Sequence, residues 1–314
     1  MSLALFQNCF YIGNNFNAIL YGVVLVLYYF TISAVLDEKR KKSKTDKFFL
    51  AYSTVLLCCN TIFVATEAVF GEEMWVVNAD YPGGMDAYLG DFASVWYQTL
   101  GTAATLFQNY LSDALLLYRC YVIWRDFRVL IVPSMLYIGS IVAGIANLAE
   151  SARPGAFYFS GLAQQFGTAY TSCIVALNIL LSLLICGRIL FSMRRLGVTL
   201  GDDMMQQYAG AAAIVVESAA LYTVFGIAYL ISFAIESDTS ILFLSLHVMF
   251  CCISPLLIVL RVMSGRAWSK ERASEFTSVI VFSGETGASA STQIGMGSHP
   301  KHSDLSLRKS DSSV

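Results

Sequence analysis

The chain has 314 residues, of which 56% are hydrophobic and only 13% are charged. Soluble domains carry about a quarter charged residues, so this composition excludes an intrinsically disordered protein and argues against an ordinary soluble fold. The formal net charge of −2 comes from 20 Lys and Arg against 22 Asp and Glu, which provides no basic field for a nucleic acid. We therefore expect an integral membrane protein that contacts the lipid bilayer and no nucleic acid.

Apolar segments long enough to cross the bilayer recur along the chain. A transmembrane helix needs about 20 apolar residues, because each residue rises about 1.5 Å and the hydrocarbon core is about 30 Å thick. The sequence predicts an all-α, seven-helix transmembrane bundle over residues 16–260, preceded by a short N-terminus over residues 1–15. The seven expected spans cover residues 16–36, 48–70, 93–118, 129–148, 166–187, 208–235 and 241–260.

The positions of the Lys and Arg residues predict the orientation of the bundle. Nineteen of the 20 cations follow the first, third, fifth or seventh expected span, and only Arg153 lies on the other side. Cations near span ends stay cytoplasmic. We therefore expect the N-terminus outside and the C-terminus in the cytoplasm, in the plasma membrane, with acidic outer segments.

The end of the chain differs in composition from the bundle. Residues 261–272 form a short basic segment, and residues 273–314 are rich in Ser, Thr and Gly with few large apolar residues. The composition predicts a disordered cytoplasmic tail. Phosphorylation of its hydroxyl groups would add charge without disturbing the bundle, and a purely solvated tail is an equal alternative.

Polar side chains within the apolar spans mark the candidate functional interior, because burying them in a membrane is costly. Glu67 is not counted among these candidates, because it lies one turn from the outer end of its span and its side chain can reach the membrane interface. Each amide has a simpler alternative role as a hydrogen bond between helices, and the imidazole as a packing residue. The candidates for a ligand contact are Asn60, Asn109, Asn178 and His247.

Two carboxylates are expected at similar depth near the cytoplasmic side. Asp113 precedes Arg119 by six residues, and Glu217 lies two to three turns into its span. An ionised carboxylate at this depth needs a partner, and an arginine side chain can extend along the helix toward it. We expect Asp113, Arg119 and Glu217 to form an inner-face network, either as a switch or as a static packing pair.

The sequence provides little for catalysis. His247 is the only histidine within an expected span, no span contains a lysine for a retinal Schiff base, and no cysteine spacing matches a zinc site. Catalytic residues, metals and cofactors are therefore not expected, and the protein is predicted not to be an enzyme. Pro255 is expected to kink the seventh span and to free backbone carbonyls one turn below His247.

The topology resembles that of G-protein-coupled receptors. Residues 112–124, SDALLLYRCYVIW, resemble the end of span three in a large group of uncharacterised seven-span proteins of mushroom-forming fungi. Tyr118, Arg119 and Cys120 are similar to the acidic-Arg-Tyr triplet of rhodopsin-like receptors, with a tyrosine in place of the acid. The span-six Trp and Pro and the outer disulfide of those receptors are missing.

Two functional interpretations from different classes remain. In the first, a receptor-like protein binds a small or lipophilic ligand outside and signals to a G protein or another cytoplasmic partner. Its basic inner residues, which contact that partner or anionic lipid, are Arg119, Arg125, Arg128, Arg194 and Arg195. In the second, a transporter or lipid-translocating protein uses Asp113, Glu217 and His247 as a path. A structural role is a third. A transporter needs polar groups at every depth, whereas a receptor needs them at two ends.

Overall fold

The structure is a computed structural model that describes residues 3–36, 44–92, 94–153, 161–196 and 202–263. The regular structure of these residues is entirely helical, which confirms the predicted all-α class. Residues 273–314, predicted to form a disordered tail, lie outside the described residues. The elements are α1 (Leu3–Leu36), α2 (Lys44–Glu72), a π-helical turn η1 (Glu73–Val77), α3 (Gly84–Phe92), α4 (Trp96–Trp124), α5 (Phe127–Ser151), α6 (Gly161–Leu196), α7 (Asp202–Ala234) and a last helix, Ser240–Met263.

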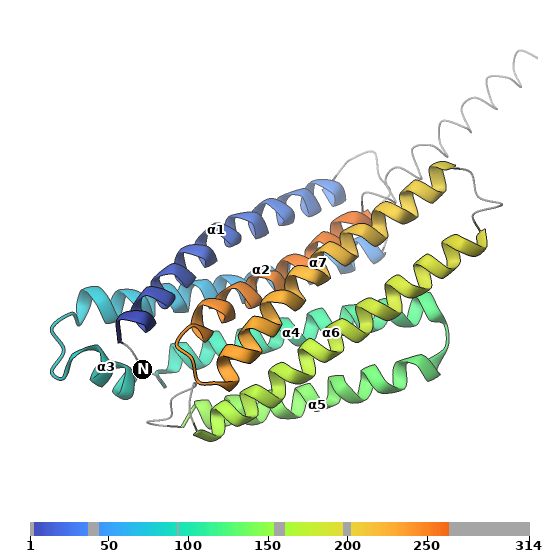
Figure 1. Cartoon of the computed structure of the whole chain (residues 1–314). Coiled ribbons are helices and arrows are strands. Elements are labelled where there is room, and N and C mark those ends of the chain that lie inside the picture. The colour runs from blue at the N-terminus through green and yellow to red at the C-terminus, as the bar shows by residue number, and fades with distance from the viewer. Residues whose placement is uncertain (1–2, 37–43, 93, 154–160, 197–201, 264–314) are drawn as a thin grey trace, which may run out of the picture. The chain divides into compact units, whose positions relative to one another are not determined.

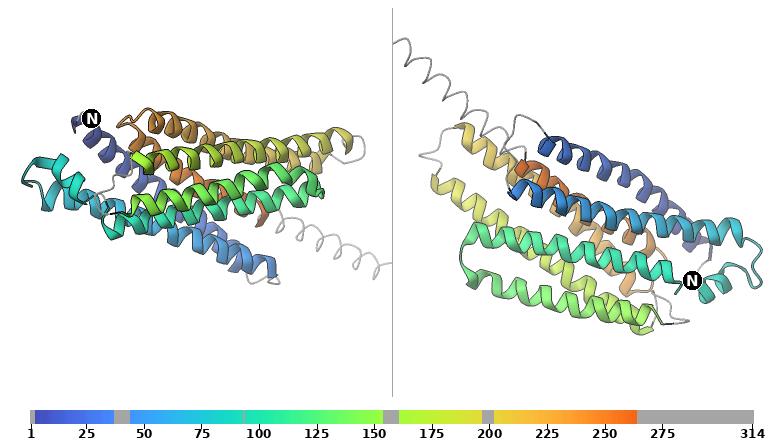
Figure 2. Two further views of the ribbon diagram at one scale, coloured as in Figure 1. Left: turned by 90° about the horizontal axis from the view of Figure 1, so that it is seen from below. Right: turned by 180° about the vertical axis from the view of Figure 1, so that it is seen from behind.

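The long helices run alternately in opposite directions and pack side by side (Figures 1 and 2). α2 packs against α1 and α4, α5 packs against α4 and α6, and α6 packs against α7. The start of α1 and the short helix α3 lie at one end of the bundle, which we call the α3 end (Figure 1). The turn between α4 and α5 lies at the other end, which we call the opposite end.

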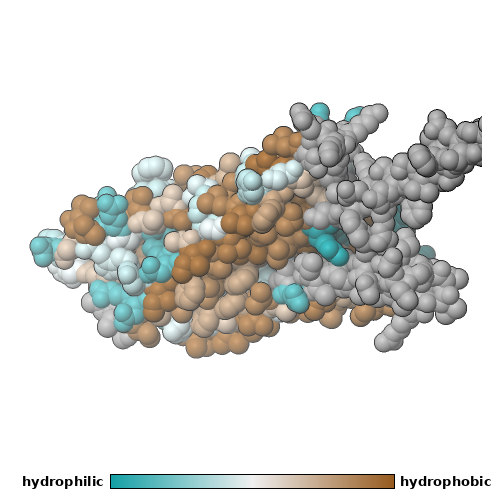
Figure 3. Space-filling view, turned by 90° about the horizontal axis from the view of Figure 1, so that it is seen from above, coloured by the Kyte–Doolittle hydropathy of each residue, from teal (hydrophilic) through white to brown (hydrophobic). Residues whose placement is uncertain are grey.

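Five helices among the described residues are long and apolar enough to cross a membrane. Leucine, isoleucine and valine side chains cover much of their outer surface, and Figure 3 shows this apolar surface across the middle of one face, with more polar residues at the α3 end. The chain is therefore a multi-pass membrane protein. The five helical segments are Leu5–Leu36, Lys44–Val77, Phe127–Ser151, Gly161–Phe191 and Ser240–Met263.

α4 is not among those five helices, because polar residues interrupt its sequence. It carries Gln108, Asn109 and Asp113 near its middle, and all three side chains are buried in the bundle. α4 also touches α2, α5 and α6, so its polar face is turned toward protein rather than lipid. A helix surrounded in this way can cross a bilayer with fewer apolar residues.

The α3 end is more ordered than the sequence predicts. α1 begins at Leu3, so residues 3–15 continue the first helix instead of forming a separate N-terminal segment. Phe6 and Phe10 hold this extension in place by packing with Phe70 and with Tyr88 of α3. The hydropathy of the sequence does not indicate α3, which is only nine residues long and packs through aromatic rings.

Candidate ligand-binding cavity

A cavity of about 130 Å³ extends from the α3 end into the bundle. All the long helices and α3 contribute to its walls, with the largest share from α4. The α4 residues Gln98, Thr102, Thr105 and Asn109 follow the three- and four-residue spacing of one helix face, so they mark the depth of the cavity. Gln98 and Asn109 are eleven residues apart, which corresponds to a depth of about 16 Å along the helix axis.

Aromatic rings and one carboxylate surround the upper part of the cavity. Phe63, Glu67 and Phe70 lie on one face of α2, and Phe6 and Phe10 approach them from α1. The Phe10 ring lies 6.1 Å from the Phe70 ring, measured between centroids. Among the described residues no cation pairs with the Glu67 carboxylate, although its backbone carbonyl accepts a hydrogen bond from Asn14. The sequence suggested that Glu67 reaches the membrane interface, whereas its side chain lines the cavity.

Three buried polar side chains form the floor of the cavity. Asn109 of α4, Thr171 of α6 and His247 of the last helix are each at most 3% exposed. The Asn109 amide donates a hydrogen bond of 2.6 Å to the Tyr170 hydroxyl, but its carbonyl oxygen has no partner. The Thr171 hydroxyl and both ring nitrogens of His247 also lack a hydrogen-bond partner. Because buried polar atoms are usually satisfied, these atoms point to a bound molecule or water at the floor.

The His247 ring is held between two tyrosines of α7. Its centroid lies 4.6 Å from the Tyr222 ring and 5.9 Å from the Tyr229 ring. The Tyr222 backbone lies close to the imidazole without making a hydrogen bond of good geometry to it. Gly226, between the tyrosines, leaves room for the ring, since a Cβ atom there would lie 3.0 Å from the imidazole Nδ1. α7 therefore positions the histidine by packing and leaves its nitrogens available.

Buried polar atoms continue for one turn below the floor. Asp113 follows Asn109 on the same face of α4, and its Oδ2 atom has no hydrogen-bond partner. Tyr170, Tyr222 and Cys251 lie near this carboxylate. The polar column of α4 thus extends from the mouth of the cavity to Asp113.

Side chains of α4 also bind the backbone of the last helix. Pro255 has no N–H group, so the carbonyl of Cys251, four residues earlier, has no partner within the helix. Ser112 donates a hydrogen bond of 3.2 Å to that carbonyl. One turn nearer the cavity, Gln108 donates to the Val248 carbonyl at 3.2 Å. α4 therefore satisfies the backbone group that Pro255 frees.

The predicted inner network of Asp113, Arg119 and Glu217 is not formed. Arg119 donates to the Ile258 carbonyl of the last helix at 3.3 Å, and among the described residues no ion pair joins it to either acid. Six residues correspond to directions about 120° apart around a helix, so the Asp113 and Arg119 side chains leave α4 in different directions. Glu217 is exposed on α7. The sequence did not indicate the rotation of each helix.

The other predicted interior amides lie outside the cavity. Asn60 of α2 is fully buried and donates to the Met249 sulfur at 3.6 Å. The Asn178 carbonyl oxygen accepts a hydrogen bond from Ser182 of its own helix at 3.4 Å. Of the four ligand contacts predicted from the sequence, the structure brings together Asn109 and His247.

Apolar packing closes the bundle between Asp113 and the opposite end. Leu116 and Cys120 of α4 pack with Ile258 of the last helix and with buried leucines of α6. A second cluster, which includes Leu56 and Leu256, fills the space between α2 and the last helix. The packing is mainly apolar, and the Tyr52 hydroxyl within the second cluster donates to the Leu111 carbonyl at 3.4 Å and lies near Ser112 and Arg119. The residues that line the cavity lie between the α3 end and this packing, so the cavity has its opening at the α3 end.

The basic residues of the opposite end have structural contacts of their own. Arg125 ends α4 in a left-handed conformation, with φ of 54°, and the backbone N–H of Arg128 donates to the Asp126 side chain that begins α5. Arg188 lies over the Trp124 ring at 5.2 Å. The side chains of Arg194 and Arg195 lie outside the described part of the chain.

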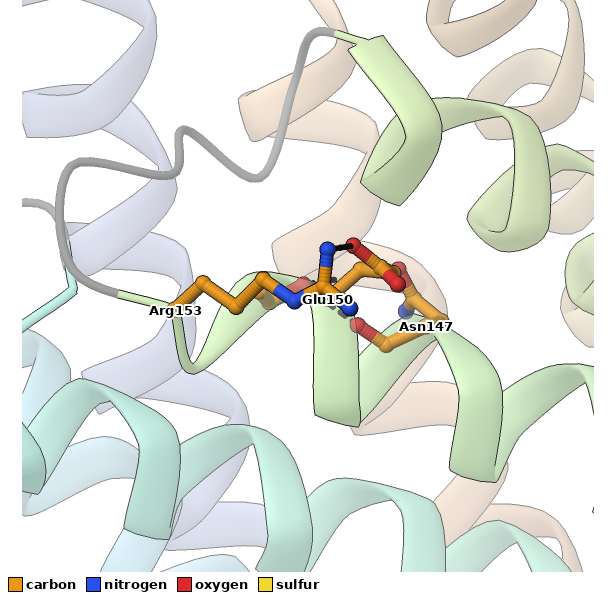
Figure 4. Close-up of polar contacts among 4 residues, drawn as sticks. Asn147, Glu150 and Arg153 are labelled. Atoms are coloured by element: carbon orange, nitrogen blue, oxygen red, sulfur yellow. Dashed lines mark hydrogen bonds and ion pairs between the residues drawn. The ribbon is translucent and has the colours of Figure 1, made fainter.

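Charge at the α3 end is mainly negative. Arg153, which the sequence places alone on this side, forms an ion pair of 2.8 Å with Glu150, as Figure 4 shows. Tyr81 donates a hydrogen bond of 2.9 Å to Asp91, and this contact raises the pKa of the Tyr81 phenol above its ordinary value. The other described acids of this end are Glu67, Glu72, Glu73, Asp80, Glu236 and Asp238.

Several cavity residues carry no signal in the sequence. Thr171 and Tyr170 resemble any other residue of an apolar span, and only the packing of α6 against α4 turns them to the floor. The part of the chain that the structure describes contains no cluster of His, Cys, Asp and Glu that would hold a metal ion. In comparisons with known proteins, no family model matches the chain and no curated protein matches it significantly.

Proposed function

We propose that the protein is a seven-span membrane receptor that binds a small, mainly apolar ligand in the cavity from outside the cell. The carrying observation is the cavity floor, where Asn109, Thr171 and His247 present buried polar atoms without partners. Ligand sites are typically apolar pockets with a few polar groups that fix orientation. The floor provides both acceptors and donors, since a neutral imidazole has one of each.

The closed opposite end favours a receptor over a transporter. The polar column of α4 stops at Asp113, and between it and Arg119 lies mainly apolar packing around Leu116 and Cys120, with the Tyr52 hydroxyl as the polar group beside it. A transport path would need polar groups or water beyond that point. A receptor needs only a mechanical connection, and α4 provides one because its residues contact both the floor and the backbone of the last helix.

The direction of signalling in this proposal is from the α3 end to the opposite end. The division of cations supports an outward-facing α3 end in the plasma membrane. A ligand held between Asn109 and His247 would favour one arrangement of α4 and the last helix. Arg119 and Arg125 at the far end of α4 would present that change to a cytoplasmic partner, such as a G protein.

The test is ligand retention by the purified protein in lipid nanodiscs. The protein is incubated with small-molecule extracts of mushroom-forming fungi, and retained compounds are identified by mass spectrometry. Asn109→Ala should lose the retained compounds, whereas Asn178→Ala should keep them, because that buried amide lies outside the cavity. Equal retention by both variants would contradict a ligand site at the floor.

A second measurement separates the receptor from the transporter. The compounds retained by the wild-type protein are added to sealed vesicles that contain it, and their uptake is measured together with guanine-nucleotide exchange on added G proteins. A receptor should stimulate exchange without uptake. Uptake that depends on Asp113 would instead support the transporter.

A further inference from the structure

Glu67 lines a cavity whose walls include four phenyl rings from α1 and α2. It shares one face of α2 with Phe63 and Phe70, at spacings of four and three residues. Phe6 and Phe10 of α1 also line the cavity, and the Phe6 and Phe10 rings stack at 6.3 Å. The extension of α1 to Leu3, which the sequence did not predict, places these two rings in the wall of the same cavity.

No positive group of the described chain balances this carboxylate. The residues that line the cavity include no Lys or Arg, and the Glu67 side chain has no ion-pair partner among the described residues. The one described cation of the α3 end, Arg153, is paired with Glu150. Several further acids belong to the α3 end of the bundle, so the field there attracts cations.

From this arrangement we infer that the ligand of the cavity is an organic cation, an amine or quaternary ammonium compound. Its positive group lies against Glu67 and the four phenyl rings, and its remaining part extends toward Asn109 and His247. Aromatic faces attract cations, and they do so more strongly where water is excluded. A buried carboxylate is destabilised when it has no partner, so a ligand of opposite charge would stabilise the ionised Glu67 side chain. This inference rests on the proposed function and adds the chemical class of the ligand.

The alternative ligand classes fit the cavity less well. An anion would meet the Glu67 carboxylate and the acidic mouth without a compensating cation. A purely apolar molecule would leave the polar atoms of Asn109, Thr171 and His247 without partners. A cation with a neutral polar group at its far end satisfies both parts of the cavity.

The test compares probes of equal shape and different charge. Benzyltrimethylammonium and neopentylbenzene differ only in the nitrogen or carbon at the branch point, and phenylacetate provides an anion. Binding is measured from the concentration dependence of the melting temperature of the protein in nanodiscs, since a ligand stabilises the state that it binds. The quaternary ammonium group donates no hydrogen bond, so it isolates the effect of charge.

The expected result is a charge preference that depends on Glu67. Glu67→Gln should weaken benzyltrimethylammonium binding roughly tenfold or more and change neopentylbenzene binding by less than about twofold. Glu72→Gln is the matched control, because this exposed acid belongs to the same helix end and does not line the cavity. It should leave the affinity for both probes unchanged.

Two outcomes would overturn the inference. One is equal binding of the cation and its neutral isostere to the wild-type protein, and the other is a cation affinity that Glu67→Gln leaves unchanged. Both leave the proposed receptor function standing, because that function is tested separately by the loss of retained compounds in Asn109→Ala. If Glu67→Gln does not fold, the order of the three probes on the wild-type protein decides the question.

Discussion

At the scale of single residues, Ser112 has the most clearly defined structural role. It donates to the Cys251 carbonyl that Pro255 deprives of its helical partner. Ser112→Ala should lower the free energy of unfolding by about 1 kcal/mol, the usual effect of losing a hydrogen bond between membrane helices. The measurement is denaturant unfolding in mild detergent micelles.

A serine with a local hydrogen bond provides the control for Ser112. Ser172 is exposed and donates only to the Thr168 carbonyl of its own helix, at 2.7 Å. Ser172→Ala should therefore change stability by less than about 0.5 kcal/mol. Equal effects of the two substitutions would show that the Ser112 contact does not hold α4 to the last helix.

Gly226 is a second residue whose identity follows from packing. A Cβ atom there would lie 2.9 Å from Val175 and 3.0 Å from the His247 imidazole. Gly226→Ala should destabilise the bundle by about 1 to 3 kcal/mol, as overpacking of a dense core does. Thermal unfolding measures the loss.

Gly22 shows what the same substitution does without crowding. No atom lies within 4 Å of a Cβ added at this exposed position of α1. Gly22→Ala should leave the melting temperature unchanged or slightly raised, because alanine favours a helix. A loss as large as that of Gly226→Ala would mean that the flexibility of glycine, and not the space beside His247, is what matters.

The sequence identified some cavity residues and missed others for a physical reason. Asn109 and His247 are conspicuous as polar groups within apolar segments, so burial cost alone singles them out. Threonine hydroxyls bond to helix carbonyls in many membrane helices, so Thr171 gives no such signal in the sequence. Glu67 was recognisable in the sequence as an acid within an apolar segment. The direction of its side chain depends on how α2 packs against α1, which the sequence does not show.

At the scale of elements, the long helices were predictable and their ends were not. Each of the seven predicted spans overlaps a long helix of the described chain, since an apolar run of sufficient length indicates each one. Ring contacts stabilise both unpredicted features, the extension of α1 over residues 3–15 and the helix α3. Within α3, the Tyr88 and Phe92 rings stack with their centroids 4.7 Å apart. A hydropathy profile does not predict which aromatic side chains will contact each other.

The rotation of α4 gives an element-scale prediction about Arg119 and Glu217. The two side chains share no contact in the structure, because Arg119 binds the Ile258 carbonyl and Glu217 is exposed. In a double-mutant cycle, the effects of Arg119→Ala and Glu217→Gln on unfolding should add to within about 0.5 kcal/mol. Recovery of stability in the double variant would instead support the inner network of Asp113, Arg119 and Glu217 that the sequence predicts.

A hydrogen-bonded pair that also involves α4 provides a positive control for the double-mutant cycle. The Asn109 amide donates to the Tyr170 hydroxyl at 2.6 Å, between α4 and α6. The cycle of Asn109→Ala and Tyr170→Phe should show a coupling of about 0.5 to 2 kcal/mol. Additivity here would mean that the method does not detect contacts between these helices.

At the scale of the whole molecule, charge and packing distinguish the two ends. The α3 end holds an acidic mouth and an open cavity, and the opposite end holds apolar clusters and arginines such as Arg119 and Arg188. The sequence predicted the division of charge, because each loop can be assigned a side by counting spans. It did not predict the cavity, whose walls come from helices distant in the chain.

The topology of the chain is the prediction on which the direction of signalling depends. α1 begins at the α3 end and the last helix runs toward the opposite end, so we expect an odd number of crossings and the two termini on different sides. The cation distribution assigns the cytoplasm to the C-terminus. In intact cells, a tag before Met1 should be cleaved by added protease, and a tag after Val314 should be protected.

Permeabilised cells provide the control, because both tags should then be cleaved. Two tags on the same side would contradict seven crossings, whatever the orientation. Opposite sides with the accessibility reversed would keep the seven crossings and place the acidic mouth in the cytoplasm. The cavity would then face inward, and an intracellular ligand would have to replace the extracellular one in the proposed function.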